Sequence, residues 1–205
     1  MIKTLIIAAV GLAVLAAAAL LVFVYVIQNV EQPEYTLVRR EGDLELRDYP
    51  ALTIAEVRRE GARTQALSAG FSPLARYIFA KERPGEKIAM TAPVIQQQAP
   101  AAASDSTPEW SVGFIMPSAA VSAGLPAPAS ADVRLTQLPP RRVAAVRFSG
   151  RTTDARTAEA RRRLEAWISA QGLDITSAPI YAYYNDPLTP GPLRRNEILL
   201  DVAAD

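Results

Sequence analysis

The 205-residue chain contains no cysteine and no histidine. The absence of cysteine excludes disulfides, zinc–thiolate sites and thiol nucleophiles. The absence of histidine removes the most common general base and a frequent metal ligand. The sequence also has no glycine-rich phosphate loop and no recognisable metal-ligand spacing. These absences favour a protein that depends on shape and apolar contact rather than on catalysis.

An excess of charge of either sign is also missing. Lys3 is the only charged residue among the first 27, which leaves 21 of the 22 basic side chains and all 21 acidic ones in the rest of the chain. A balanced domain gives no electrostatic reason to expect nucleic-acid binding. Four carboxylates, at Glu45, Asp48, Glu56 and Glu197, could form acid/base pairs, but their spacing singles out no pair. We therefore predict no enzymatic activity and no metal site.

What the sequence does contain is a long apolar segment at its start. Residues 5–27, LIIAAVGLAVLAAAALLVFVYVI, carry no charge, and a helix of that length crosses a hydrocarbon layer about 30 Å thick. Cleavable signal peptides have apolar runs of roughly 7–15 residues. We therefore predict a single-pass transmembrane anchor over residues 1–30 and a folded domain over residues 31–205. A signal peptide cleaved near the alanines at 16–19 remains the alternative.

The predicted orientation places the domain in the periplasm or another extracytoplasmic compartment. Lys3 precedes the apolar segment, and two acidic residues, Glu31 and Glu34, follow it. Arg39 and Arg40 also lie within range of the positive-inside rule and weaken this argument.

Hydrophobic periodicity predicts the elements of the domain. Alternation over residues 35–60 indicates a hairpin around Gly42-Asp43 and a third strand. A stripe at i, i+4, i+7 and i+11 from Leu67 predicts a helix, and Pro73 places the start of that helix near Ser72. Strands are predicted at 87–98, 110–117, 132–140, 141–150, 177–184 and 194–202, and a second helix at 155–171. Residues 99–108 and 118–131 are predicted to be flexible insertions without chemistry.

The two halves of the domain follow the same order of elements. Each is an extended pair, a helix, a strand, a loop and a strand, and Thr91-Ala92-Pro93-Val94 is echoed by Ser177-Ala178-Pro179-Ile180 at the same step. An internal duplication accounts for this match. We predict an α+β fold in which a duplicated strand–helix–strand–strand motif forms a distorted antiparallel β-barrel flanked by two helices, preceded by one transmembrane helix.

Several of these segments together resemble the SOUL haem-binding protein family. The resemblance rests on VRREGDLELRDYPALTIAEV, FSPLARYIF, EKIAMTAPV, WSVGFIMPS, LPPRRVAAVRFSG and YAYYNDPLTPGPLRRNEILLDV, which span about residues 35–202. It implies a duplicated α+β barrel similar to bacterial effector-binding domains, and binding of haem or related tetrapyrroles. Some members are thought to use an axial histidine and others an apolar cleft beside the first helix. Without histidine, only the second mode is open here.

On this basis the first helix supplies the main candidate binding residues. Leu74, Tyr77 and Ile78 would form an apolar wall, and Arg76 and Lys81 would reach the carboxylates of the ligand at its rim. Affinity would come from apolar burial, which contributes about 25 cal/mol per Å². The competing interpretation, which we favour, places Leu74 and Ile78 in the core and the two cations on a solvated face.

Four further candidates lie outside that helix. Met90 could place a thioether near an iron, and Arg194 could pair with a propionate. Tyr181 and Tyr183 share one strand face and could line the cavity or supply a weak ligand. In each case the structural alternative is favoured: Met90 fills the core, the tyrosines pack their rings, and Arg194 braces a turn.

The sequence thus predicts non-catalytic, non-covalent binding of haem or another tetrapyrrole in an apolar cleft, with haem buffered or delivered at the membrane. A general module for apolar small molecules or effectors is one alternative. A structural domain that binds a protein partner is the other.

Overall fold

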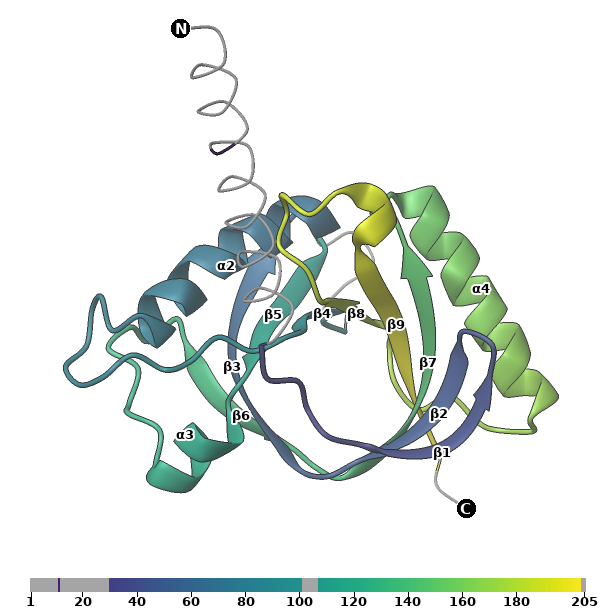
Figure 1. Ribbon diagram of the computed structural model, residues 1–205, viewed down its shortest axis with the longest axis horizontal. Coiled ribbons are helices and arrows are strands. Elements are labelled where there is room, and N and C mark those ends of the chain that lie inside the picture. Colours follow the sequence, from purple (N-terminus) through teal and green to yellow (C-terminus); the bar gives the residue numbers. More distant parts are fainter. Residues whose placement is uncertain (1–10, 12–29, 101–106, 204–205) are drawn as a thin grey trace, which may run out of the picture. The chain divides into compact units, whose positions relative to one another are not determined.

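A curled antiparallel sheet organises the domain (Figure 1). The structure, a computed structural model, describes residues 11, 30–100 and 107–203. Within these ranges nine strands pair in the order β1-β2-β7-β9-β8-β4-β5-β3-β6. Their bounds are β1 (Thr36–Glu41), β2 (Leu44–Tyr49), β3 (Leu52–Glu60), β4 (Val94–Gln98), β5 (Glu109–Ile115), β6 (Arg134–Leu138), β7 (Arg141–Ser149), β8 (Ile180–Tyr183) and β9 (Arg195–Val202).

The predicted closed barrel is wrong in one respect, because the sheet is an open half-barrel. Its two edge strands, β1 and β6, stand at opposite ends of the strand order and do not pair with each other. Helices α2 (Arg63–Ile78) and α4 (Asp154–Ala170) lie outside the curve (Figure 1). A single row of cross-strand neighbours runs across the sheet from Leu44 on β2 to Val57 on β3. Residues of this row belong to the core under α4 at one end and to the core under α2 at the other.

The strand order confirms that the two halves follow one plan. Strands β3, β4 and β5 with α2 correspond to strands β7, β8 and β9 with α4. In the strand order, corresponding strands stand at equal distances on either side of the β8–β4 pair. Each trio is completed by a strand from outside it, β6 beside β3 and β2 beside β7. Each echoed segment contacts the last strand of its half, although the bonds run in opposite directions: Thr91 Oγ1 donates to the carbonyl of Ile115 at the end of β5, and Ser177 Oγ accepts from the amide of Asp201 in β9.

Helix α2 begins nine residues before the predicted start, at Arg63, so Pro73 lies inside it. A proline inside a helix leaves the carbonyl four residues earlier without its usual donor. Here that carbonyl belongs to Ala69, and it accepts a hydrogen bond from Arg59 Nε at 3.4 Å. Gly70, one residue on, lets the helix approach β5 closely, because a Cβ there would lie 2.7 Å from that of Val112. Contacts with β3 and β5 thus stabilise a helix that Pro73 alone would shorten.

Two other predicted segments also differ from the structure. The strand predicted from residue 87 begins only at Val94, directly after Pro93, and β4 is a central strand rather than an edge. A proline cannot donate to the ladder, so the strand starts beyond it. Residues 118–131, predicted to be a flexible insertion, contain the short helix α3 (Ser118–Ala123). A further turn of 3-10 helix, η1 (Gly191–Leu193), precedes β9.

The predicted membrane anchor concerns residues 1–30, of which the structure describes Gly11 and Val30 alone. Among the described residues, no helix combines the length and the apolar character that crossing a bilayer requires.

Candidate functional site

Two hollows flank α3, and the helix presents a different face to each. The larger hollow has a volume of about 480 Å³ and the second about 450 Å³, both within the range of small-molecule sites, roughly 300–1,000 Å³. Ser118, Val121 and Ser122 line the larger hollow. Ala119, Ala120 and Ala123 line the second. These sets lie on opposite sides of a helix because residues three and four apart share a face.

Glu31 and the segment KIAMTAPV (residues 87–94) separate the two hollows. Glu31 lines both, and its Oε1 accepts hydrogen bonds from the amide of Ser118 at 2.8 Å and from its hydroxyl at 2.7 Å. The carbonyl of Glu31 accepts from the amide of Ala92 at 2.9 Å. Residues 87–89 line the second hollow, whereas Thr91 lines the larger one. The first residues of the domain are thereby fixed against α3.

The two hollows differ in charge. Glu31 and Glu34 are the charged residues that line the larger hollow, and no cation lies among its lining residues. The second hollow has two cations, Arg83 and Lys87, beside Glu31 and Glu86. Its remaining walls are almost entirely hydrocarbon: Ile88, Ala89, Pro117, Ala119, Ala120, Ala123 and Pro126. Of the two, only the second could pair an anionic group with a positive charge at an apolar wall.

Arg83 is buried at the edge of the second hollow, with 8% of its surface exposed. Its guanidinium donates to the carbonyls of Tyr77 at 2.9 Å, Pro84 at 3.0 Å and Glu86 at 2.9 Å, and it lies 5.2 Å from the centre of the Tyr77 ring. All three acceptors in the described chain are neutral carbonyl oxygens. In the described chain Arg83 has no carboxylate within ion-pair distance, and it shapes the turn after α2 through these carbonyls.

The predicted apolar wall of the first helix lies in the core. Leu74, Tyr77 and Ile78 are 0%, 4% and 1% exposed and pack against β3 and β5. The space beside Arg76 and Tyr77 is about 10 Å³, which is barely enough for one water molecule. A ligand could contact Leu74 or Ile78 only if α2 moved away from the sheet. The structural interpretation of these residues is the one that the fold shows.

Neither of the two predicted rim cations, Arg76 and Lys81, lines either of the hollows that flank α3. Arg76 is held on the surface by Glu82, with 2.8 Å between Nε and Oε1, and by the hydroxyl of Ser72 at 2.9 Å from Nη1. Lys81 is exposed just after the helix. The cations beside the second hollow come instead from the turn that follows, at residues 83 and 87.

Met90 and the two tyrosines face the helix-covered side of the sheet. Met90 is half-buried and packs against the α2 core. Tyr181 packs on Trp110, with ring centres 6.0 Å apart. The hydroxyl of Tyr183 accepts from Arg63 Nη1 at 2.9 Å and donates to Gln96 Oε1 at 3.0 Å, and burial raises its pKa. These residues thus contact protein groups around the α2 and α4 cores, and none of them lines either hollow.

Arg194 makes the contacts expected of a turn-bracing residue. Its Nε donates to the carbonyl of Thr189 at 2.7 Å, and its Nη2 donates to the carbonyl of Pro187. The guanidinium thus closes the loop between β8 and β9.

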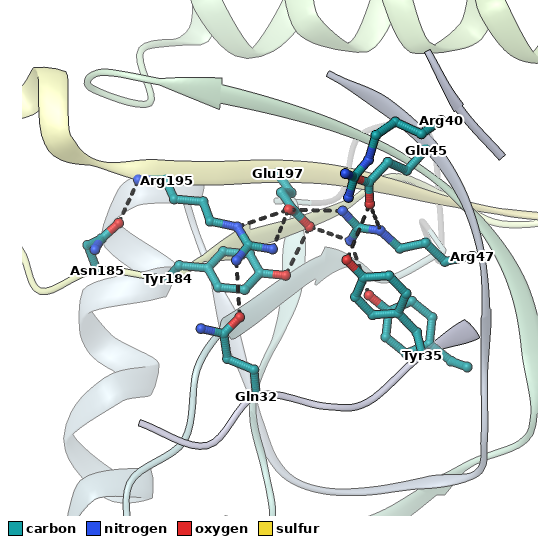
Figure 2. Close-up of polar contacts among 10 residues, drawn as sticks. Gln32, Tyr35, Arg40, Glu45, Arg47, Tyr184, Asn185, Arg195 and Glu197 are labelled. Atoms are coloured by element: carbon teal, nitrogen blue, oxygen red, sulfur yellow. Dashed lines mark hydrogen bonds and ion pairs between the residues drawn. The ribbon is translucent and has the colours of Figure 1, made fainter. Parts of the chain in front are cut away.

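A buried ion network occupies the concave face of the sheet (Figure 2). Arg47, with 2% of its side chain exposed, lies 2.7 Å from Glu197 Oε2 and 2.7 Å from Glu45 Oε2. Arg195 approaches the other oxygen of Glu197, also at 2.7 Å. The hydroxyl of Tyr184 donates to Glu197 at 2.9 Å. The network joins β2 to β9 through paired charges.

The same network reaches the start of the domain. Arg195 Nη1 donates to Gln32 Oε1 at 3.1 Å, and the hydroxyl of Tyr35 donates to Glu45 at 3.3 Å (Figure 2). Burial alone would raise the pKa of Glu197, but Arg47 and then Arg195 hold that pKa below its usual range. Both oxygens of Glu197 are thus engaged by partners within the network.

The sequence interpretation missed the residues of the second hollow and the pairing within the ion network. It took Met90 from KIAMTAPV, although Lys87, Ile88 and Ala89 are the members that line the hollow. It singled out no pair among four carboxylates, yet the fold brings Glu45 and Glu197 to the same guanidinium, that of Arg47. The one available signal was the position of Arg83 and Lys87 on either side of a proline-glycine turn.

Comparison with known proteins identifies the family and the fold. The model described as "SOUL heme-binding protein" matches residues 30–201. No curated protein matches the chain. Solved structures share the fold at low identity. The C-terminal domain of EcmrR aligns with a TM-score of 0.59 at 14% identity, covering 83% of this chain and 99% of that one.

Two structures from Listeria innocua align in the same way. One is described as an uncharacterized conserved protein, with a TM-score of 0.56 at 11% identity over 78% of this chain and 92% of that one. The other is described as a hydrolase, with a TM-score of 0.54 at 12% identity over 81% of this chain and 94% of that one. At these identities the likeness concerns the fold alone.

Proposed function

The chain belongs to the SOUL heme-binding protein family, and from this premise we propose that it binds haem or a related tetrapyrrole without catalysing a reaction. The second hollow is the proposed site. A tetrapyrrole offers a flat apolar ring and two carboxylates. The second hollow offers hydrocarbon walls and two cations, Arg83 and Lys87, beside Glu31 and Glu86, whereas the lining of the larger hollow has carboxylates and no cation. This difference in charge is the observation that carries the proposal.

The residues of the hollow fit the ring better than they fit its metal. The ring would lie against Ile88 and the alanines of α3, where burial of apolar surface contributes about 25 cal/mol per Å². Lys87, which is exposed, would pair with a propionate. No methionine or tyrosine lines this hollow, and the whole sequence has no histidine or cysteine. The chain would therefore hold the macrocycle by water exclusion, and any iron chemistry would come from the haem alone.

A non-catalytic role is part of the proposal. In the described ranges, no group of three or more acidic residues converges in a way that could hold a metal ion. The most buried carboxylate, that of Glu197, is occupied by two arginines and a tyrosine.

We further propose that the apolar segment at residues 5–27 anchors the chain in a membrane and that the domain faces the extracytoplasmic side. Haem held there would be buffered or delivered at the membrane surface. Protease treatment of spheroplasts tests the orientation, because an extracytoplasmic domain is digested and a cytoplasmic one is protected.

A matched pair of substitutions on α3 tests the site. Ala119→Trp fills the second hollow, and Ser122→Trp fills the larger one, while both positions are exposed on the same short helix. The full chain in detergent is titrated with haemin and with metal-free protoporphyrin. We expect saturable binding of both ligands with similar affinity, lost in A119W and retained in S122W. Absence of saturable binding by the unsubstituted chain would refute the proposed function.

A second candidate function concerns the larger hollow. Its walls include Pro33, Pro50, Leu52, Ile115, Met116 and Val121, and its only charges are carboxylates. Such a site suits an uncharged apolar small molecule, which would make the domain a general effector-binding module. Tighter binding of neutral lipids than of any porphyrin, abolished by S122W, would favour this alternative.

A further inference from the structure

The loop between β8 and β9, residues 185–194, carries the two most exposed large hydrophobic side chains of the described residues. Leu188 is 84% exposed and Leu193 is 67% exposed. The other large hydrophobic side chains that lie exposed in the described ranges, such as Leu37 and Ile175, are at most 45% exposed. Two largely exposed leucines five residues apart are costly in water and indicate a surface that something else covers.

Internal hydrogen bonds hold this loop in one shape. Asp186 accepts from the amides of Leu188 at 2.7 Å and Thr189 at 3.0 Å, through its side chain and its carbonyl. Arg194 closes the loop from inside through the carbonyls of Pro187 and Thr189. The carbonyl of Gly191 accepts from the amide of Gly150 at 2.9 Å, which ties the loop to the end of β7. Three prolines restrict it further. The leucines are thus displayed by a pre-organised loop, so that little ordering is needed on contact.

The loop lies beside the start of the domain. The guanidinium of Arg195, the residue after the loop, donates to Gln32 Oε1 at 3.1 Å (Figure 2). The backbone amide of Arg195 donates to Asn185 Oδ1 at 2.5 Å. The apolar segment ends at residue 27, and five residues of extended chain span at most roughly 17 Å. A bilayer that held residues 5–27 would therefore have its surface within that distance of Gln32.

We propose that residues 185–194 form a second contact of the domain with the lipid bilayer, in which Leu188 and Leu193 enter the interface. This inference rests on the proposed membrane anchor and goes beyond ligand binding. Two leucines alone bind a bilayer weakly, since stable attachment takes two signals. A tether a few residues away makes the second contact intramolecular and raises its effective concentration. The domain then has a fixed orientation on the membrane rather than free rotation about its linker.

Charge near the loop does not oppose this contact. The two charged residues within the loop are both engaged. Asp186 accepts loop amides through its backbone and its side chain, and Arg194 donates to loop carbonyls.

The absence of cysteine allows a direct test. Leu188→Cys and Leu193→Cys each introduce a single thiol for an environment-sensitive dye in the full chain, reconstituted in vesicles of phosphatidylcholine and phosphatidylglycerol. Ile175→Cys is the matched control. Ile175 is an exposed branched residue, 42% accessible, that bridges to Val202 at the far end of β9. Brominated lipids are then used to quench each dye.

We expect quenching at residues 188 and 193 to exceed that at residue 175 at least twofold, with a blue shift of the emission on reconstitution. Equal quenching at all three positions overturns the proposal. A blue shift that appears in native membranes but not in pure lipid vesicles also overturns it, because the partner is then a protein. Alkaline carbonate extraction separates the two proposals: a chain that is extracted refutes the anchor, whereas a retained chain with water-exposed dyes refutes the loop contact alone.

Discussion

Two buried arginines show how differently two regions of the domain treat charge. Arg47, on the concave face, is surrounded by carboxylates and lies 2.7 Å from both Glu45 and Glu197. Arg83, after α2, is almost as buried but contacts only carbonyl oxygens and the face of Tyr77. The first region compensates its charge within the protein. The second leaves a positive charge beside an apolar hollow.

The difference indicates which region serves the fold and which is available to a ligand. In the ion network every charged atom is committed, so an incoming ligand would have to displace an existing partner. A guanidinium held by neutral carbonyls keeps its full charge and attracts an anion through a low-dielectric wall. Burial of charged side chains is therefore no guide to function by itself. The informative feature is whether the charge is compensated.

The largest effect is expected from Arg47→Met. The substitution leaves Glu197 and Glu45 buried without their shared partner, and breaking a buried pair in this way costs about 3–5 kcal/mol. Urea unfolding of the full chain in detergent, followed by circular dichroism, measures the loss. The fraction that stays folded should bind haemin with unchanged affinity. A variant with normal stability would show that the network does not hold β2 to β9.

The converse substitution, Arg83→Met, should have a smaller effect on stability and a larger one on binding. Of the three carbonyls that lose their donor, only that of Tyr77 takes part in a fully buried bond, while those of Pro84 and Glu86 can turn to water. One unsatisfied buried polar group costs about 1–3 kcal/mol. The substitution also removes a cation of the second hollow, so that haemin affinity should fall several-fold. Parallel urea and haemin titrations of the two variants make the comparison. If both variants lost the same affinity, the distinction between the two regions would fail.

A change of pH should act on the ion network and leave the Arg83 turn alone. For Glu197, burial would raise the pKa, but Arg47 and Arg195 lower it below its ordinary value. Burial would also raise the pKa of Glu45, and Arg47 and Arg40 lower it in the same way. A carboxyl with a lowered folded pKa stabilises the fold above its unfolded pKa, and this contribution is lost as the pH falls through the folded value. The free energy of unfolding should therefore decrease on acidification below about pH 4.3.

Glu197→Gln is the control for this dependence. The free energy of unfolding of this variant should vary less between pH 6 and pH 3 than that of the unsubstituted chain. Asp201 works in the opposite direction, because burial raises its pKa although Arg141 lowers it. An identical acid dependence in the variant would assign the effect to the surface carboxylates instead.

Local sequence pattern was enough to predict most of the elements, and tertiary contacts explain where it failed. Alternation of apolar and polar residues placed β2 and β3 within a few residues. The pattern started α2 nine residues too late, because the donor that satisfies the carbonyl of Ala69 comes from Arg59 on β3. It missed α3, a six-residue helix without a side-chain cap, which Glu31 fixes from 87 residues away.

The candidate site could not be predicted residue by residue for a related reason. A stripe of apolar residues on a helix indicates burial, and Leu74, Tyr77 and Ile78 are indeed buried, but against the sheet. The second hollow forms only when the turn after α2, the short helix α3 and Glu31 come together. None of these three parts has a periodic sequence signal. The family resemblance suggested a type of ligand, whereas placing Arg83 and Lys87 beside one hollow required the structure.

The smallest effect on haemin binding is expected from a comparison of two lysines six residues apart. Lys87 lines the second hollow, while Lys81, which the sequence singled out, is exposed outside it. An exposed ion pair contributes about 0.2–1 kcal/mol, so Lys87→Gln should weaken haemin binding by roughly two- to five-fold and leave stability unchanged. Lys81→Gln is the matched control and should bind as the unsubstituted chain does. The effect should shrink at high salt, since screening weakens exposed pairs. Equal losses in the two variants would mean that general surface charge, rather than this hollow, attracts the ligand.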